Sequence, residues 1–512
     1  MAKRFIKSGL GLFVVLGLLA CSDPPSEEPL QFDSVIRNGQ LVDGLGGAAR
    51  AADVYLSEGL IAAITAPGEL DALTSGSIDA TGKIIAPGFI DVHSHGNPLE
   101  TPDFENFLAQ GVTTITLGQD GDSPNVADLG EWLREVRENG IGVNLAMFVG
   151  HGALRELAGI GQDPVPGADQ MQRMLELLNN ALDHAFGLST GLEYNPGLHA
   201  QETELVEMAK VVGSRDRVIM SHMRNEDDDQ LEQSIDELLS QGLYARVHIS
   251  HLKSVYGKGR ERAEEILELI ERARQSGIEL SADVYPYNAS YAGLALLFPV
   301  WSKTDEEFAV ALRDRREELE EYLIARITKR NGPEATLLAT DPYTGKTLAD
   351  LEQELGLPFE KILIDVIGPQ GGSGAYFIMD DELQSRLLED DNITVSSDGS
   401  PTGFHPRGHG TFAKIIEEYV VNRAALPLEE AVRKMTSYSA ELLGVSDRGS
   451  IEVGMAADLI IFDPALVKAR ATYAEPLQLA EGFEVVIVNG VVAFQDGRRL
   501  AVAAGEVLSP AE

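Results

Sequence analysis

Between residues 86 and 446 the chain alternates short apolar segments with stretches of helical periodicity, and it does so eight times. A parallel strand that is buried on both faces has an apolar sequence, and the helix after it carries the chain back to the start of the next strand. Eight such units in succession are typical of a closed barrel of TIM type. The sequence therefore predicts an α/β fold, a (β/α)8 barrel whose strands end at His95, Leu117, Gly150, Ser189, His222, His251, Tyr285 and Asp398.

The seventh connection of this predicted barrel, residues 288–392, is far longer than a barrel loop requires. It has helical periodicity of its own, most clearly over residues 305–329. Connections of this length are usually lids or binding elements. We therefore expect a lid inserted between strands seven and eight of a barrel domain that spans residues 86–446.

The two ends of the chain differ from this pattern. Residues 32–85 and 447–508 contain short β-type segments separated by turn signals such as Asn38-Gly39 and Glu58-Gly59. Because similar segments lie at both ends, we expect them to pair into one small β-sandwich that brackets the barrel.

The first twenty residues have the features of an export signal. Basic residues precede an apolar run over residues 10–20, which is too short to span a bilayer as an ordinary helix. The run ends in Leu-Leu-Ala before Cys21, which resembles a bacterial lipoprotein signal and implies cleavage of residues 1–20 and lipidation of Cys21. Ser22 after the cysteine favours an outer-membrane anchor facing the periplasm. Residues 21–31 are expected to form a flexible tether.

Charge and cysteine content exclude some classes of function. The formal net charge is −40, and a surface of that sign repels phosphate backbones, which argues against a nucleic-acid partner. Cys21 is the only cysteine, so the mature chain has no disulfide and no thiolate to offer a metal.

Histidines and carboxylates follow several predicted strands, at the barrel edge where such enzymes carry their active-site groups. His93 and His95 share one face of the first strand, although two hydrogen-bonded core histidines would give the same pattern. The same edge receives further donors, Asp120, His222, His251 and Asp398. Nitrogen and oxygen ligands in this mixture suit one or two divalent ions, zinc best, with manganese, iron and cobalt also compatible.

Several motifs support a family resemblance. Residues 88–95 (GFIDVHSH) resemble the opening signature of the amidohydrolase superfamily. The other motifs resemble the N-acyl-D-amino-acid deacylase (D-aminoacylase) group, and they occur in the same order. They are residues 187–194 (GLSTGLEY), 221–224 (SHMR), 248–253 (HISHLK), 283–287 (DVYPY), 397–399 (SDG), 405–407 (HPR) and 454–464 (GMAADLIIFDP). The resemblance extends from about residue 32 to residue 508.

The resemblance implies two metal positions, one held by His93, His95 and Asp398 and the other by His222 and His251. The family usually supplies a cysteine after the second strand, where this chain has Asp120. A carboxylate can also ligate or bridge, but it is a harder ligand than a thiolate. We expect Asp120 to be a metal ligand; the alternative is that it only caps a turn with Gly121.

The resemblance also assigns catalytic and substrate roles. Asp398 is implied as the general base, which accepts a proton from metal-activated water and passes it to the leaving amine. The implied substrate-binding residues are Tyr194, Lys253, Tyr285, Arg407 and, as a looser match, Ser290. Cations and hydroxyls at these positions favour an anionic substrate such as an acylated amino acid.

The function expected is hydrolysis of the amide bond of N-acyl-D-amino acids or of peptides that end in a D-residue, peptidoglycan fragments and environmental peptides included. A dipeptidase, or a cyclic-amide hydrolase similar to dihydroorotase or hydantoinase, on the same scaffold is the alternative among enzymes. Outside the enzymes, the alternative is a lipid-anchored binding protein without turnover.

Overall fold

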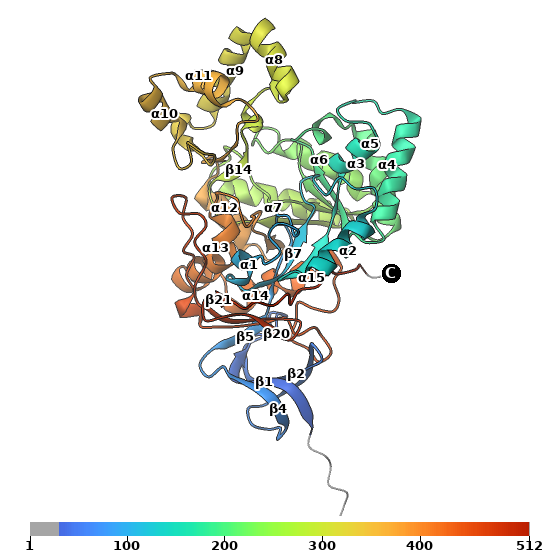
Figure 1. Ribbon diagram of the computed structural model, residues 1–512, viewed down its shortest axis with the longest axis vertical. Helices are drawn as coiled ribbons and strands as arrows, with labels where there is room; N and C mark the ends of the chain where they lie inside the picture. Colours follow the sequence, from blue (N-terminus) through green and yellow to red (C-terminus); the bar gives the residue numbers. More distant parts are fainter. Residues whose placement is uncertain (1–29, 511–512) are drawn as a thin grey trace, which may run out of the picture.

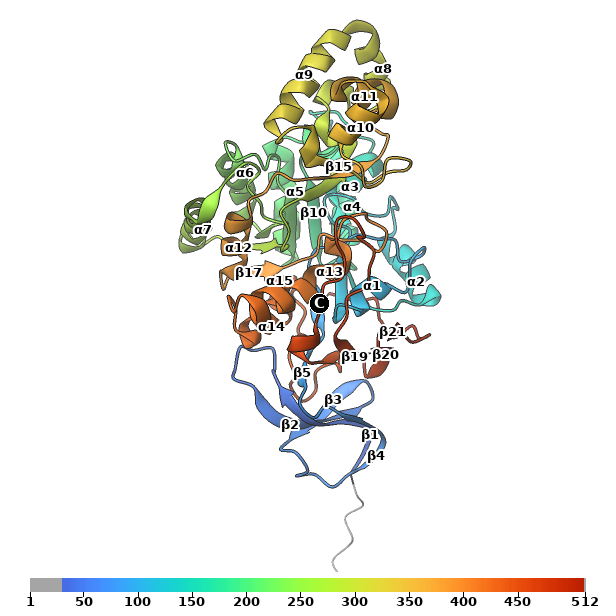
Figure 2. The same ribbon diagram turned by 90° about the vertical axis from the view of Figure 1, so that its left-hand side faces the viewer.

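The structure is a computed structural model that describes residues 30–510. The expected signal peptide, Cys21 and nearly all of the tether lie outside these residues. Within residues 30–510, no helix has both the length and the apolar character needed to cross a bilayer. Figures 1 and 2 show a central α/β body with a lid at one end and a sheet at the other.

Parallel strands at the centre follow the predicted order. They are β6 (Phe89–Asp91), β7 (Val112–Leu117), β8 (Asn144–Met147), β9 (Val149–Gly150), β10 (Gly187–Gly191), β11 (Val218–His222), β12 (Arg246–Ile249), β13 (Leu280–Val284) and β17 (Ile393–Val395). β8 and β9 are two pieces of one strand interrupted at Phe148; β8 pairs with β7, and β9 pairs with β10. The third strand therefore links a sheet of three strands to a sheet of six.

The end of the eighth strand, β17, lies beside the end of the first strand, β6. Ser94 and Gly399 form a parallel bridge just beyond β6 and β17. The amide of His95 donates to the carbonyl of Gly399 at 2.8 Å, and the amide of Asp398 donates to the carbonyl of His93 at 2.8 Å. These bonds place the ends of the first and eighth strands, and the polar groups they carry, side by side.

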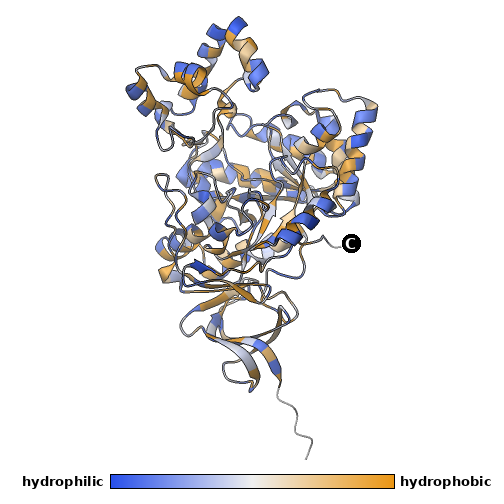
Figure 3. Cartoon of the chain, viewed as in Figure 1, coloured by the Kyte–Doolittle hydropathy of each residue, from blue (hydrophilic) through white to orange (hydrophobic). Residues whose placement is uncertain are grey.

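Helices surround these strands because each presents one apolar face. In α4, for example, Met174, Leu178 and Ala181 recur at helical spacing and are buried. Figure 3 shows the polar faces of the outer helices turned outward. The helices of the body are α1 (Glu105–Leu108), α2 (Leu129–Asn139), α3 (His151–Leu157), α4 (Ala168–Ala181), α5 (Glu202–Ser214), α6 (Leu231–Gly242), α7 (Gly259–Gln275), α12 (Asp381–Glu389), α13 (Arg407–Lys414), α14 (Leu428–Met435) and α15 (Ser437–Leu443).

The long connection forms a lid with its own apolar cluster, which includes Leu319, Leu323 and Leu348. Its elements are β14 (Ser290–Gly293), β15 (Thr336–Leu338), β16 (Ser373–Tyr376), α8 (Asp305–Asp314), α9 (Arg316–Lys329), α10 (Leu348–Leu355) and α11 (Phe359–Ile362). The helical stretch expected over 305–329 is broken at Arg315, where φ is −138°. α12 packs on α7, so the last part of the connection belongs to the body.

Strands from both chain ends pair in one nine-stranded sheet rather than in two separately bonded sheets. β5 and β18 join the two ends in antiparallel pairing. The strands are β1 (Gln31–Leu41), β2 (Arg50–Ser57), β3 (Leu60–Thr65), β4 (Leu73–Asp79), β5 (Ile84–Pro87), β18 (Leu459–Phe462), β19 (Phe483–Val488), β20 (Val491–Gln495) and β21 (Arg498–Arg499). Beyond β21 the chain returns to the body, where the amide of Leu508 donates to the carbonyl of Leu145 at 2.8 Å.

Asp458 connects this sheet to the body. Its carboxylate accepts hydrogen bonds from the side chain of Asn144 at 2.9 Å and from the amide of Asn489 at 2.7 Å. It also pairs with Arg448 at 2.5 Å, and both charged side chains are buried. Removing one partner of a buried ion pair leaves the other charge uncompensated, which is strongly destabilising.

We predict that Asp458→Ala lowers the free energy of unfolding by about 3–5 kcal/mol, measured by urea denaturation. Asp447 is a matched control because it pairs with the same Arg448 at 3.1 Å but is 64% exposed. Asp447→Ala should cost about 0–1 kcal/mol, the usual range for an exposed pair. Equal losses in the two variants would contradict the role given to the buried pair.

Candidate metal centre

The structure brings the predicted ligands together at the carboxyl ends of the central strands. They lie just after β6, β7, β12 and β17 and at the end of β11. Asp120, His251 and Asp398 have left-handed backbones, with φ of 55°, 39° and 49°. Non-glycine residues rarely adopt this conformation, and where they do it often serves a functional site. Here the sharp turn that ends each strand aims the side chain across the barrel mouth.

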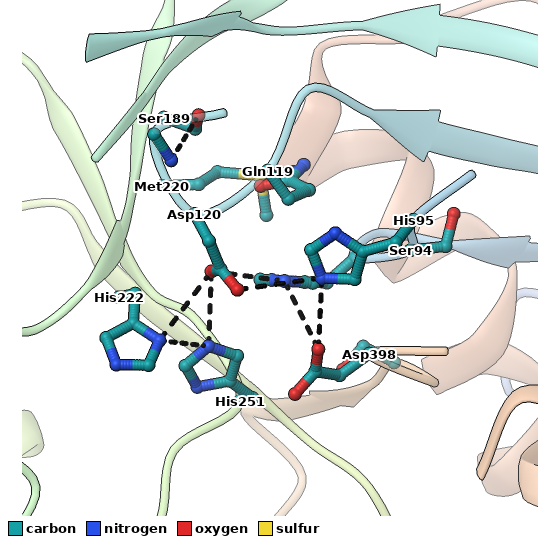
Figure 4. Close-up of polar contacts among 12 residues, drawn as sticks. Ser94, His95, Gln119, Asp120, Ser189, Met220, His222, His251 and Asp398 are labelled. Atoms are coloured by element: carbon teal, nitrogen blue, oxygen red, sulfur yellow. Dashed lines mark hydrogen bonds and ion pairs between the residues drawn. The ribbon is translucent and has the colours of Figure 1, made fainter. Parts of the chain in front are cut away.

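Four of these side chains form the first ligand cluster. The Nε2 atom of His95 lies 3.1 Å from Oδ1 of Asp398 and 3.5 Å from Oδ2 of Asp120. The Nε2 atom of His93 lies 3.3 Å from Oδ1 of Asp120. The donor atoms of all four side chains lie within 4.8 Å of one another (Figure 4). This spacing suits a single cation with imidazole and carboxylate ligands.

The second cluster shares Asp120 with the first. The Nδ1 atom of His222 lies 2.9 Å from Nε2 of His251. Oδ1 of Asp120 lies 3.2 Å from that same His251 nitrogen and 3.8 Å from the His222 nitrogen (Figure 4). Asp120 therefore lies between the clusters, within reach of all four histidines. This arrangement fits a carboxylate that bridges two cations. It favours that role for Asp120 over the alternative that Asp120 only caps a turn with Gly121.

The electrostatics of the centre favour a bound cation. Neither ring nitrogen of His93 has a hydrogen-bond partner of acceptable geometry, although the ring is buried. Burial disfavours the charged imidazolium of His251 and Lys253 repels it, yet the carboxylates of Asp120 and Asp398 raise its pKa to about 10. Burial alone would raise the pKa of Asp398, but Arg407 and the neighbouring histidines hold it well below its usual range. The buried carboxylate of Asp398 and the half-buried carboxylate of Asp120 remain ionised here, and the donor set fits one or two divalent ions.

Groups behind the ligands hold their loops in place. Ser189 lies in a Gly-x-Ser-x-Gly sequence, residues 187–191, that is also found around nucleophilic serines. Its hydroxyl instead donates to the carbonyl of Gly118 at 2.5 Å and accepts from the amide of Gly121 at 3.1 Å (Figure 4). Ser189 thereby fixes both sides of the turn that presents Asp120.

His248 supports a ligand and is not itself a member of either ligand cluster. It bonds to Asp283 at 2.6 Å, and that carboxylate accepts from the amide of His251 at 2.9 Å. The other ring nitrogen of His248 lies 2.8 Å from the hydroxyl of Ser281. Support of a ligand from behind by a carboxylate is a recurrent feature of metal sites.

The five residues expected to bind substrate line one pocket, with an empty volume of about 430 Å³, next to Asp120 and Asp398. The buried hydroxyl of Ser290 has no hydrogen-bond partner. Burial raises the pKa of Tyr285 to about 12, so its hydroxyl stays protonated at neutral pH. The Tyr194 ring lies 4.5 Å from the ring of His222. The pocket thus combines hydroxyl donors with Asp120, which both ligand clusters share, and with Asp398.

The two cationic side chains expected to bind substrate, Arg407 and Lys253, both have carboxylate partners. Nη1 of Arg407 lies 2.6 Å from Oδ2 of Asp398, on the oxygen turned away from His95. Nζ of Lys253 lies 2.8 Å from Oε1 of Glu226 and 2.7 Å from Nδ1 of His251. Glu226 also lies 3.2 Å from that nitrogen, so it positions both a cation and a ligand.

Sequence reasoning did not single out Glu226, although it lies in the polar stretch that follows β11, four residues after His222. Glu193, 3.3 Å from Nε2 of His222, was missed in the same way. The only signal available in the sequence was that both lie close to predicted site residues, because their partners come from other strands.

Comparison with known proteins agrees with this geometry. The Amidohydrolase family profile matches residues 308–494. An N-acyl-D-glutamate deacylase of Alcaligenes xylosoxydans xylosoxydans is 32% identical over 492 residues, which cover 91% of this chain and 94% of that enzyme. The structure of an N-acyl-D-glutamate deacylase from Bordetella bronchiseptica, complexed with zinc and a phosphonate mimic of the tetrahedral intermediate, has a TM-score of 0.80 at 32% identity. It covers 94% of this chain and 100% of that one.

A D-aminoacylase structure concerned with a binuclear metal centre has a TM-score of 0.79 at 29% identity, covering 93% of this chain and 100% of that one. The fold and the paired ligand clusters define a hydrolase scaffold that binds metal, and the chain belongs to the amidohydrolase family. Its full-length relatives are deacylases of N-acyl-D-amino acids. The predicted α/β fold is confirmed, and it matches that of the D-aminoacylase structures.

We predict that Asp120→Ala lowers affinity for zinc at both positions, because both clusters lose a ligand. The loss should be at least about tenfold, since even residues behind a ligand contribute that much. Metal bound per chain is measured by elemental mass spectrometry across a series of buffered zinc concentrations.

Asp122→Ala is the matched control, because Asp122 lies in the same loop but outside both clusters. It should retain the metal affinity of the unaltered protein. Indistinguishable metal binding by the two variants would show that Asp120 is not a ligand.

Proposed function

We propose that this protein is a metal-dependent amide hydrolase that releases a D-amino acid from its N-acyl or peptidyl form. The observation that carries the proposal is one pocket lined by members of both ligand clusters together with Lys253, Tyr285 and Arg407. The cluster members that line it are Asp120, His222, His251 and Asp398. A water-activating centre and donors for a substrate carboxylate are the two parts that this reaction needs. Relatives that are deacylases of N-acyl-D-amino acids support the D-configuration.

The two clusters support two metal positions. His93, His95, Asp120 and Asp398 would hold one divalent ion, and Asp120, His222 and His251 a second. Zinc suits these ligands best, and manganese, iron and cobalt are compatible with them. When bound, such an ion lowers the pKa of water and polarises a carbonyl group.

Asp398 is proposed to move the proton. Its carboxylate accepts a proton from the attacking water and passes it to the nitrogen of the leaving amine. Arg407 holds Oδ2 of this carboxylate at 2.6 Å and therefore fixes its orientation. A substrate carboxylate that draws Arg407 toward itself would weaken this pair and leave Asp398 free to accept the proton.

Binding of the substrate carboxylate is proposed to use Arg407, Lys253 and the hydroxyl of Tyr285, with Tyr194 and Ser290 on the same pocket wall. Charge-assisted bonds of this kind are stronger than neutral ones. Lys253 is already aligned by Glu226, so it is held in place before the substrate arrives.

The cellular setting follows from the N-terminal sequence alone. We propose export and lipid anchoring through Cys21, in the outer membrane facing the periplasm. Such a location would bring the enzyme to peptidoglycan fragments and to peptides from outside the cell.

The proposal is tested by assaying the zinc-loaded enzyme on N-acetyl-D- and N-acetyl-L-amino acids, L,D-dipeptides and cyclic amides. We expect hydrolysis of the N-acetyl-D-amino acids, and a loss of about 10²–10⁴-fold in kcat for Asp398→Asn, the usual contribution of acid–base catalysis. Asp314→Asn, an exposed lid carboxylate, is the control.

Activity confined to L-compounds would contradict the stereochemistry, and activity confined to dipeptides or cyclic amides would favour those reactions instead. Metal binding without turnover on any of these compounds would favour a binding protein. Full activity of Asp398→Asn would remove it as the base.

We further predict that Lys253→Ala raises KM by roughly tenfold or more, because a charge-assisted bond to the substrate carboxylate is lost. The accompanying decrease in kcat should be smaller. Steady-state kinetics on the preferred N-acetyl-D-amino acid measures both constants. An unchanged KM would take Lys253 out of the carboxylate site and leave it only the support of His251.

A further inference from the structure

The pocket beside the metal centre also contains a cation from the lid. Arg330 directly follows α9, and its amide donates to the carbonyls of Arg326 and Ile327 at 3.1 and 3.0 Å. Its side chain lines the same pocket as Lys253 and Tyr285, and the residue is only 3% exposed. The lid thus places a guanidinium in the pocket that also contains Lys253, Tyr285 and Arg407 of the body.

Arg330 differs from the other pocket cations in its partners. Lys253 pairs with Glu226, and Arg407 pairs with Asp398. Within residues 30–510, Arg330 forms no ion pair with a carboxylate, and its buried Nε has no hydrogen-bond partner. A buried charge without a partner is costly, so a counter-ion at this position would remove that cost.

The surroundings hold this guanidinium in place without neutralising it. It lies over the ring of Tyr376, 5.1 Å from the ring centroid. The Tyr376 hydroxyl is directed at the carbonyls of Ala292 and Gly293, both at 3.4 Å, which fixes the ring. Val255, Leu296 and Ile378 add apolar surface to the same pocket. Stacking on an aromatic face orients the planar fork of an arginine toward a carboxylate.

We propose that Arg330 binds the side-chain carboxylate of the substrate, so that the preferred substrates are N-acyl derivatives of acidic D-amino acids. The inference rests on the function proposed above. In that function Arg407, Lys253 and Tyr285 serve the α-carboxylate, which leaves Arg330 for a second anionic group. The apolar residues that line the same pocket suit the methylene groups of a glutamate-like side chain.

The test compares N-acetyl-D-glutamate with N-acetyl-D-glutamine, which has nearly the same shape but no side-chain charge. We expect the zinc-loaded enzyme to favour the glutamate compound in kcat/KM by roughly tenfold to a hundredfold, the usual value of a hydrogen-bonded charge pair. In Arg330→Gln this ratio should fall to about one, while kcat/KM for the glutamine compound changes little. Binding of N-acetyl-D-glutamate to the Asp398→Asn variant, with and without Arg330→Gln, gives a calorimetric readout that does not depend on turnover.

Arg313→Gln is the matched control, because Arg313 is a lid arginine that is 69% exposed and does not line this pocket. It should keep the ratio of the unaltered enzyme. A ratio near one in the unaltered enzyme, or a ratio that Arg330→Gln leaves unchanged, would overturn the inference while hydrolysis of the glutamine compound upholds the proposed function. N-succinyl-D-leucine carries a carboxylate on its acyl group and none on its side chain. If Arg330→Gln lowered activity only on this compound, Arg330 would bind the acyl group, which would also overturn the inference. Absence of turnover on every N-acyl-D-amino acid would instead contradict the proposed function itself.

Discussion

One carboxylate, that of Asp120, joins the two halves of the candidate metal centre. Asp120 lies 3.2–3.8 Å from nitrogens of four imidazoles at three different strand ends, and both ligand clusters include it. A thiolate at this position would offer a single soft donor atom, whereas a carboxylate offers two hard oxygens with separate directions. The two oxygens are used differently here, since Oδ2 faces His95 and Oδ1 faces the remaining histidines.

The geometry around Asp120 depends on groups that contact no substrate. Ser189 holds the turn that carries it, Asp283 holds the backbone of His251, and Glu226 holds the outer nitrogen of the same ring. Because each support comes from a different strand, the centre exists only when the strands are correctly ordered around the mouth. The positions of the ligands therefore follow from the topology of the fold.

Much of this arrangement could be predicted from the sequence, for a physical reason. Parallel strands buried on both faces are apolar runs, and polar residues at their ends have few places to lie other than the barrel mouth. His93, His222 and Asp398 could be found in this way. The pairing of Lys253 with Glu226 could not, because it joins two strand ends whose loop conformations no periodicity specifies.

The lid was the least predictable part. Its length indicated a binding element, but its fold depends on its own apolar cluster and on contacts across the pocket. The break at Arg315 and the entry of Arg330 into the pocket both arise from that packing. The end sheet also departs from the expected β-sandwich, since pairing of β5 with β18 joins the strands of both chain ends in one hydrogen-bonded sheet.

The joining of β5 to β18 has a consequence for how the protein is made. Leu459 pairs with Pro87, so all residues between β5 and β18 must be synthesised before these two strands can pair. Until then one edge of β5 is open, and open edges invite pairing with other chains. Contacts this distant in sequence also slow folding. We therefore expect the nascent chain to be prone to aggregation until its last strands are synthesised. A polypeptide truncated before β18 should stay prone to aggregation, because the edge of β5 remains unpaired.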